Sequence, residues 1–301
     1  MGSDVSKEDL DELKGCGEST ASLRNAFKAA KTGEKMDWST YDLNHDDEAH
    51  FDIDSEEGQK RVDILKEQLD PDLVKQNPRL IDFVCSACLN FRNGHLETAA
   101  ERVNNYLVWR VLMFGSLQDM NLNDDAELRT IIDRNIFNLV KNIDSEGRSA
   151  MCLRIRNMDP SVITPKMALK AWHFTIMMAL KDKVVQRKGI FIISDMMGAS
   201  FGNLDSRIPK AVMGAISRAV PIRVFKVLIC RPLWIAYIAI PVVKMFISTK
   251  LAERITIAGD PSNLPQYGVD MTVLPINLKG SNTAYDYQTF VQELVDANVI
   301  V

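Results

Sequence analysis

The segment Gly189–Phe201 constrains the fold of this chain more than any other. Four apolar residues, Ile190–Ile193, follow a glycine. Ser194 and Asp195 come directly after them, and Gly198 follows two methionines later. A short apolar run between turn-forming residues predicts a buried strand that enters a tight loop. Apolar helical patterns flank this strand on both sides, so the segment indicates an α/β core that holds apolar material.

Strand and helix patterns alternate from about residue 125 onward. Strands are expected over 150–156, 190–194, 224–230 and 255–258, and helices over 164–185, 205–220 and 233–246. This alternation predicts an α/β fold with a largely parallel sheet and packed helices. Residues 55–114 instead show helical spacing, as in Leu80, Phe83, Val84 and Ala87. We therefore expect a polar, partly flexible segment at 1–55, a helical unit at 56–120 and an α/β domain at 121–301.

Charge is unevenly distributed along the chain. The net charge is −4. Residues 37–57 contain nine acidic side chains and no Lys or Arg, whereas residues 206–254 contain nine basic side chains and one Glu. A basic region in an acidic protein indicates a local anionic partner, such as a phosphate or a lipid headgroup, rather than nucleic acid. Solubilising charge without a partner is the alternative.

The cysteines and the N-terminus bear on location. The five cysteines have no disulfide-framework spacing, which favours reduced thiols and a cytoplasmic setting. The pair Cys85 and Cys88 lies in a helical pattern, so we expect core residues and neither a metal nor a cofactor. The longest apolar run, Leu233–Val243, is too short to cross a bilayer. Gly2 with Ser6 fits the myristoylation pattern, although a cloning remnant has the same start.

One motif suggests catalysis. Gly198, Ser200 and Gly202 match the G-x-S-x-G elbow of serine hydrolases, between an expected strand and an expected helix. That elbow needs a downstream histidine, and all four histidines precede Ser200. A hydrolase using Ser200 is therefore kept only as an alternative.

Two apolar patterns and a basic pair favour binding instead. Leu169, Trp172, His173 and Ile176 share one helix face, which is either ordinary core or the wall of a ligand cavity. The 233–247 segment carries Lys244 as its only charge, so it is a buried helix or a lid. Lys250 and Arg254, four residues apart just beyond it, suit an anionic membrane surface.

These residues resemble the CRAL-TRIO lipid-binding family over roughly residues 60–295. Within it, the resemblance is greatest to the branch of alpha-tocopherol transfer protein and cellular retinaldehyde-binding protein. The matching segments are Asn93–Arg110, Gly189–Phe201, Ala219–Arg223, Lys244–Gly259 and Leu274–Gly280. The chain departs from the family pattern in four ways. Lys279 replaces a glycine, Met245 replaces a proline, the spacing from Pro221 to Pro232 is one residue short, and only Arg92 remains of an arginine-rich motif.

The resemblance implies a non-catalytic carrier that binds a small hydrophobic lipid and transfers it between membranes. The implied cavity residues are Leu169, Trp172, His173, Ile176, Ile190, Ile192, Ser194, Ile216 and Val220. The implied lid residues are Leu233, Trp234, Tyr237, Ile238 and Phe246. The implied phosphoinositide contacts are Arg92, Arg223, Lys250 and Arg254. A ligand-free adaptor with the same fold is the other alternative. The resemblance does not specify which lipid is bound. We expect a cytoplasmic protein that associates transiently with membranes.

Overall fold

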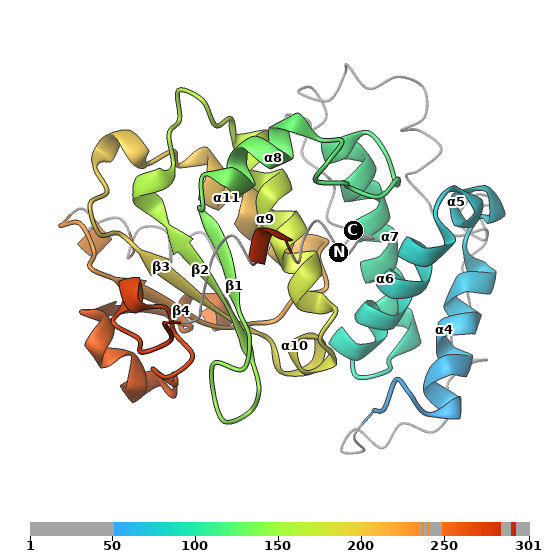
Figure 1. Cartoon of the computed structure of the whole chain (residues 1–301). Coiled ribbons are helices and arrows are strands. Elements are labelled where there is room, and N and C mark those ends of the chain that lie inside the picture. The colour runs from blue at the N-terminus through green and yellow to red at the C-terminus, as the bar shows by residue number, and fades with distance from the viewer. Residues whose placement is uncertain (1–50, 235, 238–239, 241–248, 284–289, 293–301) are drawn as a thin grey trace. The chain divides into compact units, whose positions relative to one another are not determined.

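The structure is a computed structural model that describes residues 51–234, 236–237, 240, 249–283 and 290–292 (Figure 1). The predictions for Gly2, Lys244, Met245 and the lid residues Ile238 and Phe246 lie outside these residues. The chain divides into two compact units. Unit 1 comprises Met1–Gln118 with Arg218–Pro221, and unit 2 comprises Asp119–Ser217 with Ile222–Val301.

Unit 1 is helical, which confirms the helical pattern expected over 55–114. Its described helices are α4 (Glu56–Gln68), α5 (Pro71–Gln76), α6 (Pro78–Phe91) and α7 (Leu96–Phe114). Polar side chains cap the helix starts: the Ser55 hydroxyl accepts from the Gly58 amide at 3.0 Å. The Asn77 side chain accepts from the Leu80 amide at 3.0 Å. Helix α6 packs against α4, α5 and α7, and most of its apolar side chains are buried.

Unit 2 contains a five-stranded sheet in the order β1-β2-β3-β4-β5. The strands are β1 (Phe137–Val140), β2 (Ser149–Arg154), β3 (Ile190–Asp195), β4 (Val224–Cys230) and β5 (Ile255–Gly259). Strand β1 pairs antiparallel with β2, and the other neighbouring pairs are parallel. The expected α/β fold with a largely parallel sheet is confirmed, and β1 is a strand that the sequence pattern missed.

The helices of unit 2 lie before, between and after the strands in the sequence. The α-helices are α8 (Ala126–Asp133), α9 (Pro165–Leu180), α10 (Lys183–Lys188), α11 (Arg207–Arg218) and α13 (Thr249–Ala252). The 3₁₀-helices are η2 (Ile155–Asn157), η3 (Phe201–Asn203), η4 (Pro261–Tyr267) and η5 (Ile276–Leu278). No described helix is long and apolar enough to span a bilayer.

The single helix expected over 164–185 was wrong, because the chain breaks between α9 and α10. The Asp182 side chain accepts from the Val184 amide at 2.8 Å and caps the new helix. The Gln186 side chain donates to the Leu180 carbonyl at 2.7 Å, which satisfies an acceptor at the end of α9. The expected strand over 150–156 also ends early, since 155–157 form η2.

The C-terminal part of unit 2 covers one face of the sheet. Alternate residues of the central strands, including Cys152, Ile193 and Leu228, form one buried cluster with Leu264 and Leu274. In Figure 1 the orange-red segment 260–283 lies on the side of the sheet away from α9. The other alternate residues of each strand therefore point towards the helix side.

Candidate functional site

The helix side of the sheet carries two apolar rows that run across the strands. The register aligns Met151, Ile192, Val227 and Ile255 in one row. It aligns Leu153, Ser194, Ile229 and Ile257 in the next row, nearer the carboxyl ends of the parallel strands. The rows come from four strands far apart in sequence, so strand pairing alone assembles them.

Burial differs between these rows. Every side chain of the first row is buried. All four residues of the second row, which we call the open row (Leu153, Ser194, Ile229 and Ile257), are only partly buried. On the opposite face, Cys152, Ile193 and Leu228 are at most 4% exposed at the same level. The open row is therefore less covered by the protein's own packing than the first row and than these three opposite-face residues.

Three predicted cavity residues lie on this face, because Ile190, Ile192 and Ser194 alternate along β3. The sequence prediction missed the other members of the open row. Their period-2 alternation was readable in each strand, but the register that aligns them was not. The open row could therefore be found only once the pairing of the strands was known.

The predicted helix residues lie on α9. Leu169, Trp172, His173 and Ile176 are each at most 1% exposed. The indole N–H of Trp172 is buried without a hydrogen-bond partner among the described residues. Most other side chains of α9 are buried too, so burial alone does not distinguish this face from ordinary core.

The remaining predicted cavity and lid residues are more scattered. Ile216 is buried on α11. Val220 lies in Arg218–Pro221, which belongs to unit 1, so it is not part of the group that unit 2 assembles. Leu233 is partly buried in the chain that follows β4, and Trp234 and Tyr237 are exposed.

An exposed aromatic pair lies at the start of the predicted lid. The rings of Phe201 and Trp234 meet edge to face, with centroids 5.9 Å apart. The two residues are 55% and 64% exposed. Met197, which follows β3, is also exposed. Large exposed apolar side chains of this kind indicate an interaction surface when they gather.

The structure brings two of the predicted basic residues together. Arg254 Nη1 donates to the carbonyl of Val224, next to Arg223, at 2.6 Å. The Arg223 carbonyl in turn accepts from the Ile190 amide at 2.9 Å. Both arginines therefore lie where β4 and β5 begin, at the opposite end of these strands from the open row.

The other two basic residues are placed less closely. Lys250 lies on α13, shortly before Arg254, and its side chain is outside the described atoms. Arg92 belongs to unit 1, where its guanidinium lies 5.0 Å from the Phe91 ring centroid. Arg102 lies 4.8 Å from the same ring centroid. Burial, together with the nearby positive charge of Arg92, lowers the pKa of Arg102.

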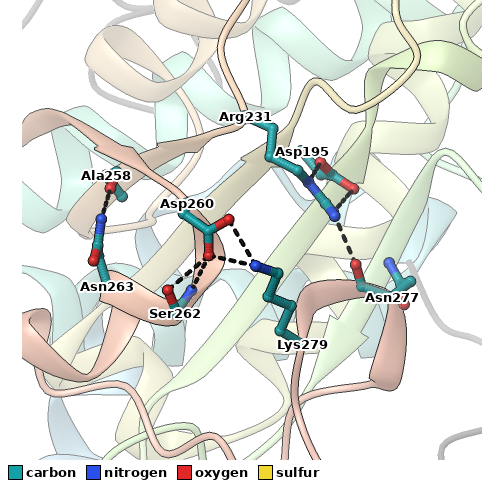
Figure 2. Close-up of polar contacts among 8 residues, drawn as sticks. All are labelled: Asp195, Arg231, Ala258, Asp260, Ser262, Asn263, Asn277 and Lys279. Atoms are coloured by element: carbon teal, nitrogen blue, oxygen red, sulfur yellow. Dashed lines mark hydrogen bonds and ion pairs between the residues drawn. The ribbon is translucent and has the colours of Figure 1, made fainter.

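A polar clamp joins β3 and β4 to the C-terminal segment (Figure 2). Arg231 contacts Asp195 through two hydrogen bonds, Nε to Oδ1 at 2.9 Å and Nη2 to Oδ2 at 2.6 Å. Its Nη2 also donates to the Asn277 carbonyl at 2.8 Å. Lys279 Nζ lies 2.7 Å and 2.8 Å from the two carboxylate oxygens of Asp260. These contacts hold the segment onto the sheet.

The G-x-S-x-G motif has a structural role here. The Ser200 hydroxyl donates to Asn203 Oδ1 at 3.0 Å, and the Ser200 amide donates to the same oxygen at 2.8 Å. This arrangement caps η3. The hydroxyl is thus directed at an amide oxygen rather than at a histidine or carboxylate, which is the partner a serine nucleophile needs.

The cysteine pair lies in the core of unit 1. Cys85 and Cys88 are free and buried, and burial raises the pKa of Cys88 to about 12. A thiol with such a pKa is a poor nucleophile and a poor metal ligand. The described residues contain no cluster of His, Cys, Asp and Glu that could hold a metal.

Part of this chain matches a known family model. The CRAL/TRIO domain model matches residues 133–280. The alpha-tocopherol transfer protein-like protein of Mus musculus is 24% identical over 164 residues, which are 54% of this chain and 48% of that protein. Its Homo sapiens counterpart is 23% identical over 173 residues, 56% of this chain and 50% of that protein.

Two further comparisons are more distant or more partial. Tyrosine-protein phosphatase non-receptor type 9 of Homo sapiens is 28% identical over 157 residues, 52% of this chain and 26% of that protein. The crystal structure of Sfh5 superposes with a TM-score of 0.43 at 14% identity, covering 80% of this chain and 98% of that one. The chain thus matches about a quarter of the phosphatase and about half of the transfer protein-like relatives.

Proposed function

Because residues 133–280 form a CRAL/TRIO domain, a domain that binds and transfers hydrophobic lipids, we propose that this chain is a non-catalytic carrier of a small lipid. The observation that carries the proposal is the open row on the helix side of the sheet. Partly covered apolar side chains on one face of a sheet are the wall that an apolar ligand needs.

The proposed cavity lies between this wall and the helices. The side chains of Leu169, Trp172, His173 and Ile176 would line it from α9, and Ile216 from α11. Burying about 400 Å² of apolar ligand surface contributes roughly 10 kcal/mol. Loss of ligand freedom offsets much of this gain, so binding stays reversible. Reversibility is what transfer between membranes requires.

Native mass spectrometry after mild extraction tests the carrier proposal. Ser194 is the smallest side chain of the open row, so Ser194→Phe should fill the ligand space. The mass peak of the lipid-bound protein should then disappear. Ser194→Ala keeps the space and should retain the lipid. If the wild-type protein carries no lipid and takes none up from vesicles, the chain is an adaptor and not a carrier.

Docking to phosphoinositide membranes is the second part of the proposal. Arg223 and Arg254 lie together in unit 2, and Lys250 is four residues before Arg254. Each cation close to an anionic surface contributes about 1 kcal/mol. We include Arg92 of unit 1 among the contacts, and a cytoplasmic location with transient membrane association. Myristoylation of Gly2 would add one weak, reversible anchor.

A vesicle-binding assay tests the docking step. Lys250→Ala with Arg254→Ala should weaken binding to phosphoinositide vesicles by about tenfold or more. The matched control is Arg207→Ala with Lys210→Ala, which removes the same charge from exposed positions on α11. Equal binding by both double variants and the wild type would remove the docking step and leave the carrier proposal untouched.

Lid opening completes the proposed mechanism. The exposed pair Phe201 and Trp234 lies where the predicted lid begins, and these rings would enter the membrane interface after the basic residues dock. The lid, proposed over residues 232–247, would then open against the bilayer, where its apolar face costs little free energy. The ligand would exchange there before the lid closes.

A further inference from the structure

A polar pocket lies at the carboxyl ends of β2 and β3, apart from the residues assigned to lipid and to docking. Its volume is about 420 Å³, within the range of about 300–1,000 Å³ that is common for small-molecule sites. Its lining residues are Arg134, Arg156, Asn157, Asp159 and Asn203. The pocket lies just beyond the carboxyl ends of the parallel strands β2 and β3, which lead into η2 and towards η3.

Two asparagines fix the walls of the pocket. Asn157 Nδ2 donates to the carbonyl of Arg134 at 2.8 Å and to that of the next residue at 3.1 Å. Asn203 Nδ2 donates to the carbonyl of Arg156 at 3.2 Å and to that of Met158 at 2.7 Å. These bonds tie together the end of α8, the η2 turn and the η3 turn. The backbone that carries both arginines is therefore held before any ligand arrives.

The two guanidinium groups are largely uncommitted. Within the described part of the chain, the side chain of Arg156 makes no hydrogen bond or ion pair. Arg134 Nη1 lies 3.9 Å from Asp159 Oδ2, at the outer limit of an ion pair. Asp159 Oδ1 is occupied, because it accepts from the Ser161 amide at 3.0 Å and the Ser161 hydroxyl at 2.6 Å. The pocket thus keeps an excess of positive charge and of free donors.

We propose that this pocket binds a phosphate monoester group. Planar guanidinium groups donate paired hydrogen bonds to phosphate oxygens, and two of them line this open pocket. The phosphate could belong to a soluble metabolite or to a lipid headgroup, and the chemistry of recognition is the same.

Calorimetric titration with glycerol 3-phosphate tests the soluble source. The wild-type protein should bind, and Arg156→Ala should weaken binding by about tenfold or more, since a charged hydrogen-bond donor is lost. Asp159→Asn removes a competing negative charge and should strengthen binding. Arg207→Ala is the control, because it removes an exposed arginine of unit 2 that is already paired with Asp205.

Vesicles of phosphatidylcholine with phosphatidic acid test the lipid source. Binding that is lost in Arg156→Ala but kept in Arg207→Ala supports the headgroup as the ligand. If neither probe binds, or if both variants reduce binding equally, the pocket is not a phosphate site. The bound lipid seen by native mass spectrometry should be the same in all these variants, so this test is independent of the carrier proposal.

Discussion

Arg231 leaves β4 in the left-handed backbone region, with φ of 48°, and its side chain closes the polar clamp. The side chains of Arg231 and Asp195 are only 20% and 10% exposed. Arg231→Met would leave the Asp195 carboxylate without its cation, so we expect the free energy of unfolding to fall by about 2 kcal/mol. Urea unfolding measures this loss.

Arg129→Met provides the comparison for that prediction. Arg129 makes a similarly short pair with Asp133, 2.8 Å, but the two side chains are 42% and 50% exposed. Exposed pairs contribute about 0–1 kcal/mol, so this variant should unfold almost as the wild type does. If the two variants lose the same stability, burial of the clamp has no energetic consequence.

The Asp260–Lys279 pair predicts a pH dependence. Hydrogen bonds from Lys279 and from Ser262 hold the pKa of Asp260 well below its usual range. A lowered pKa in the folded state adds stability above about pH 4, and that stability is lost as the pH falls through the folded pKa. The urea midpoint of Lys279→Met should therefore differ from the wild type more at pH 6 than at pH 2.5. A difference that does not change with pH would contradict this account.

At the scale of elements, Gly189 determines how β3 enters the sheet. Its φ is 86°, and a Cβ there would lie 2.6 Å from the Arg223 carbonyl oxygen. Gly189→Ala should lower the free energy of unfolding by about 2–3 kcal/mol or more, from backbone strain and from the displaced β4 start. Thermal and urea unfolding would measure it.

Gly268 supplies the matched control for this element. Its φ is 85°, but a Cβ there would meet nothing within 4 Å. Gly268→Ala therefore carries the backbone cost alone, about 1 kcal/mol. The difference between the two variants measures the close approach of β3 to Arg223. Equal losses would show that this approach can relax.

Element boundaries show what sequence reasoning can and cannot supply. Strand β4 was predicted with its bounds, because Val224–Cys230 is a strongly apolar run between turn residues. The break after α9 was missed, because the apolar periodicity continues to Val185 and only the Asp182 cap interrupts it. Strand β1 was missed because four residues carry too little periodicity, and its evidence lies in pairing with β2.

At the scale of the whole molecule, a carrier should be stabilised by its cargo. A ligand that binds only the folded state adds RT ln(1 + [L]/Kd) to the free energy of unfolding, about 2.7 kcal/mol at 100 times Kd. Delipidated protein should therefore melt at a lower temperature than protein reloaded from lipid vesicles. In differential scanning calorimetry, Ser194→Phe should melt at the same temperature with and without lipid. If the melting temperature of the wild-type protein does not change when lipid is added, the result would argue against a lipid-filled cavity.

The candidate site likewise could be predicted from the sequence only where its residues lie on one strand or helix. Sequence reasoning named Ile190, Ile192 and Ser194 as one face, since alternation along one strand is local. It could not name Leu153 or Ile229, which join them only through the register of separate strands. Pairs such as Arg223 and Arg254 likewise come together only when β4 and β5 lie side by side.

The strand order has a consequence for synthesis. Strands β2 to β5 are neighbours in chain order, so right-handed crossovers leave their connections on a single face. The opposite face is covered by residues such as Leu264, Leu274 and Leu278, which follow all five strands in the sequence. A growing chain on the ribosome therefore exposes an apolar face of the sheet until these residues emerge. During that interval the chain is most prone to aggregate and most in need of a chaperone.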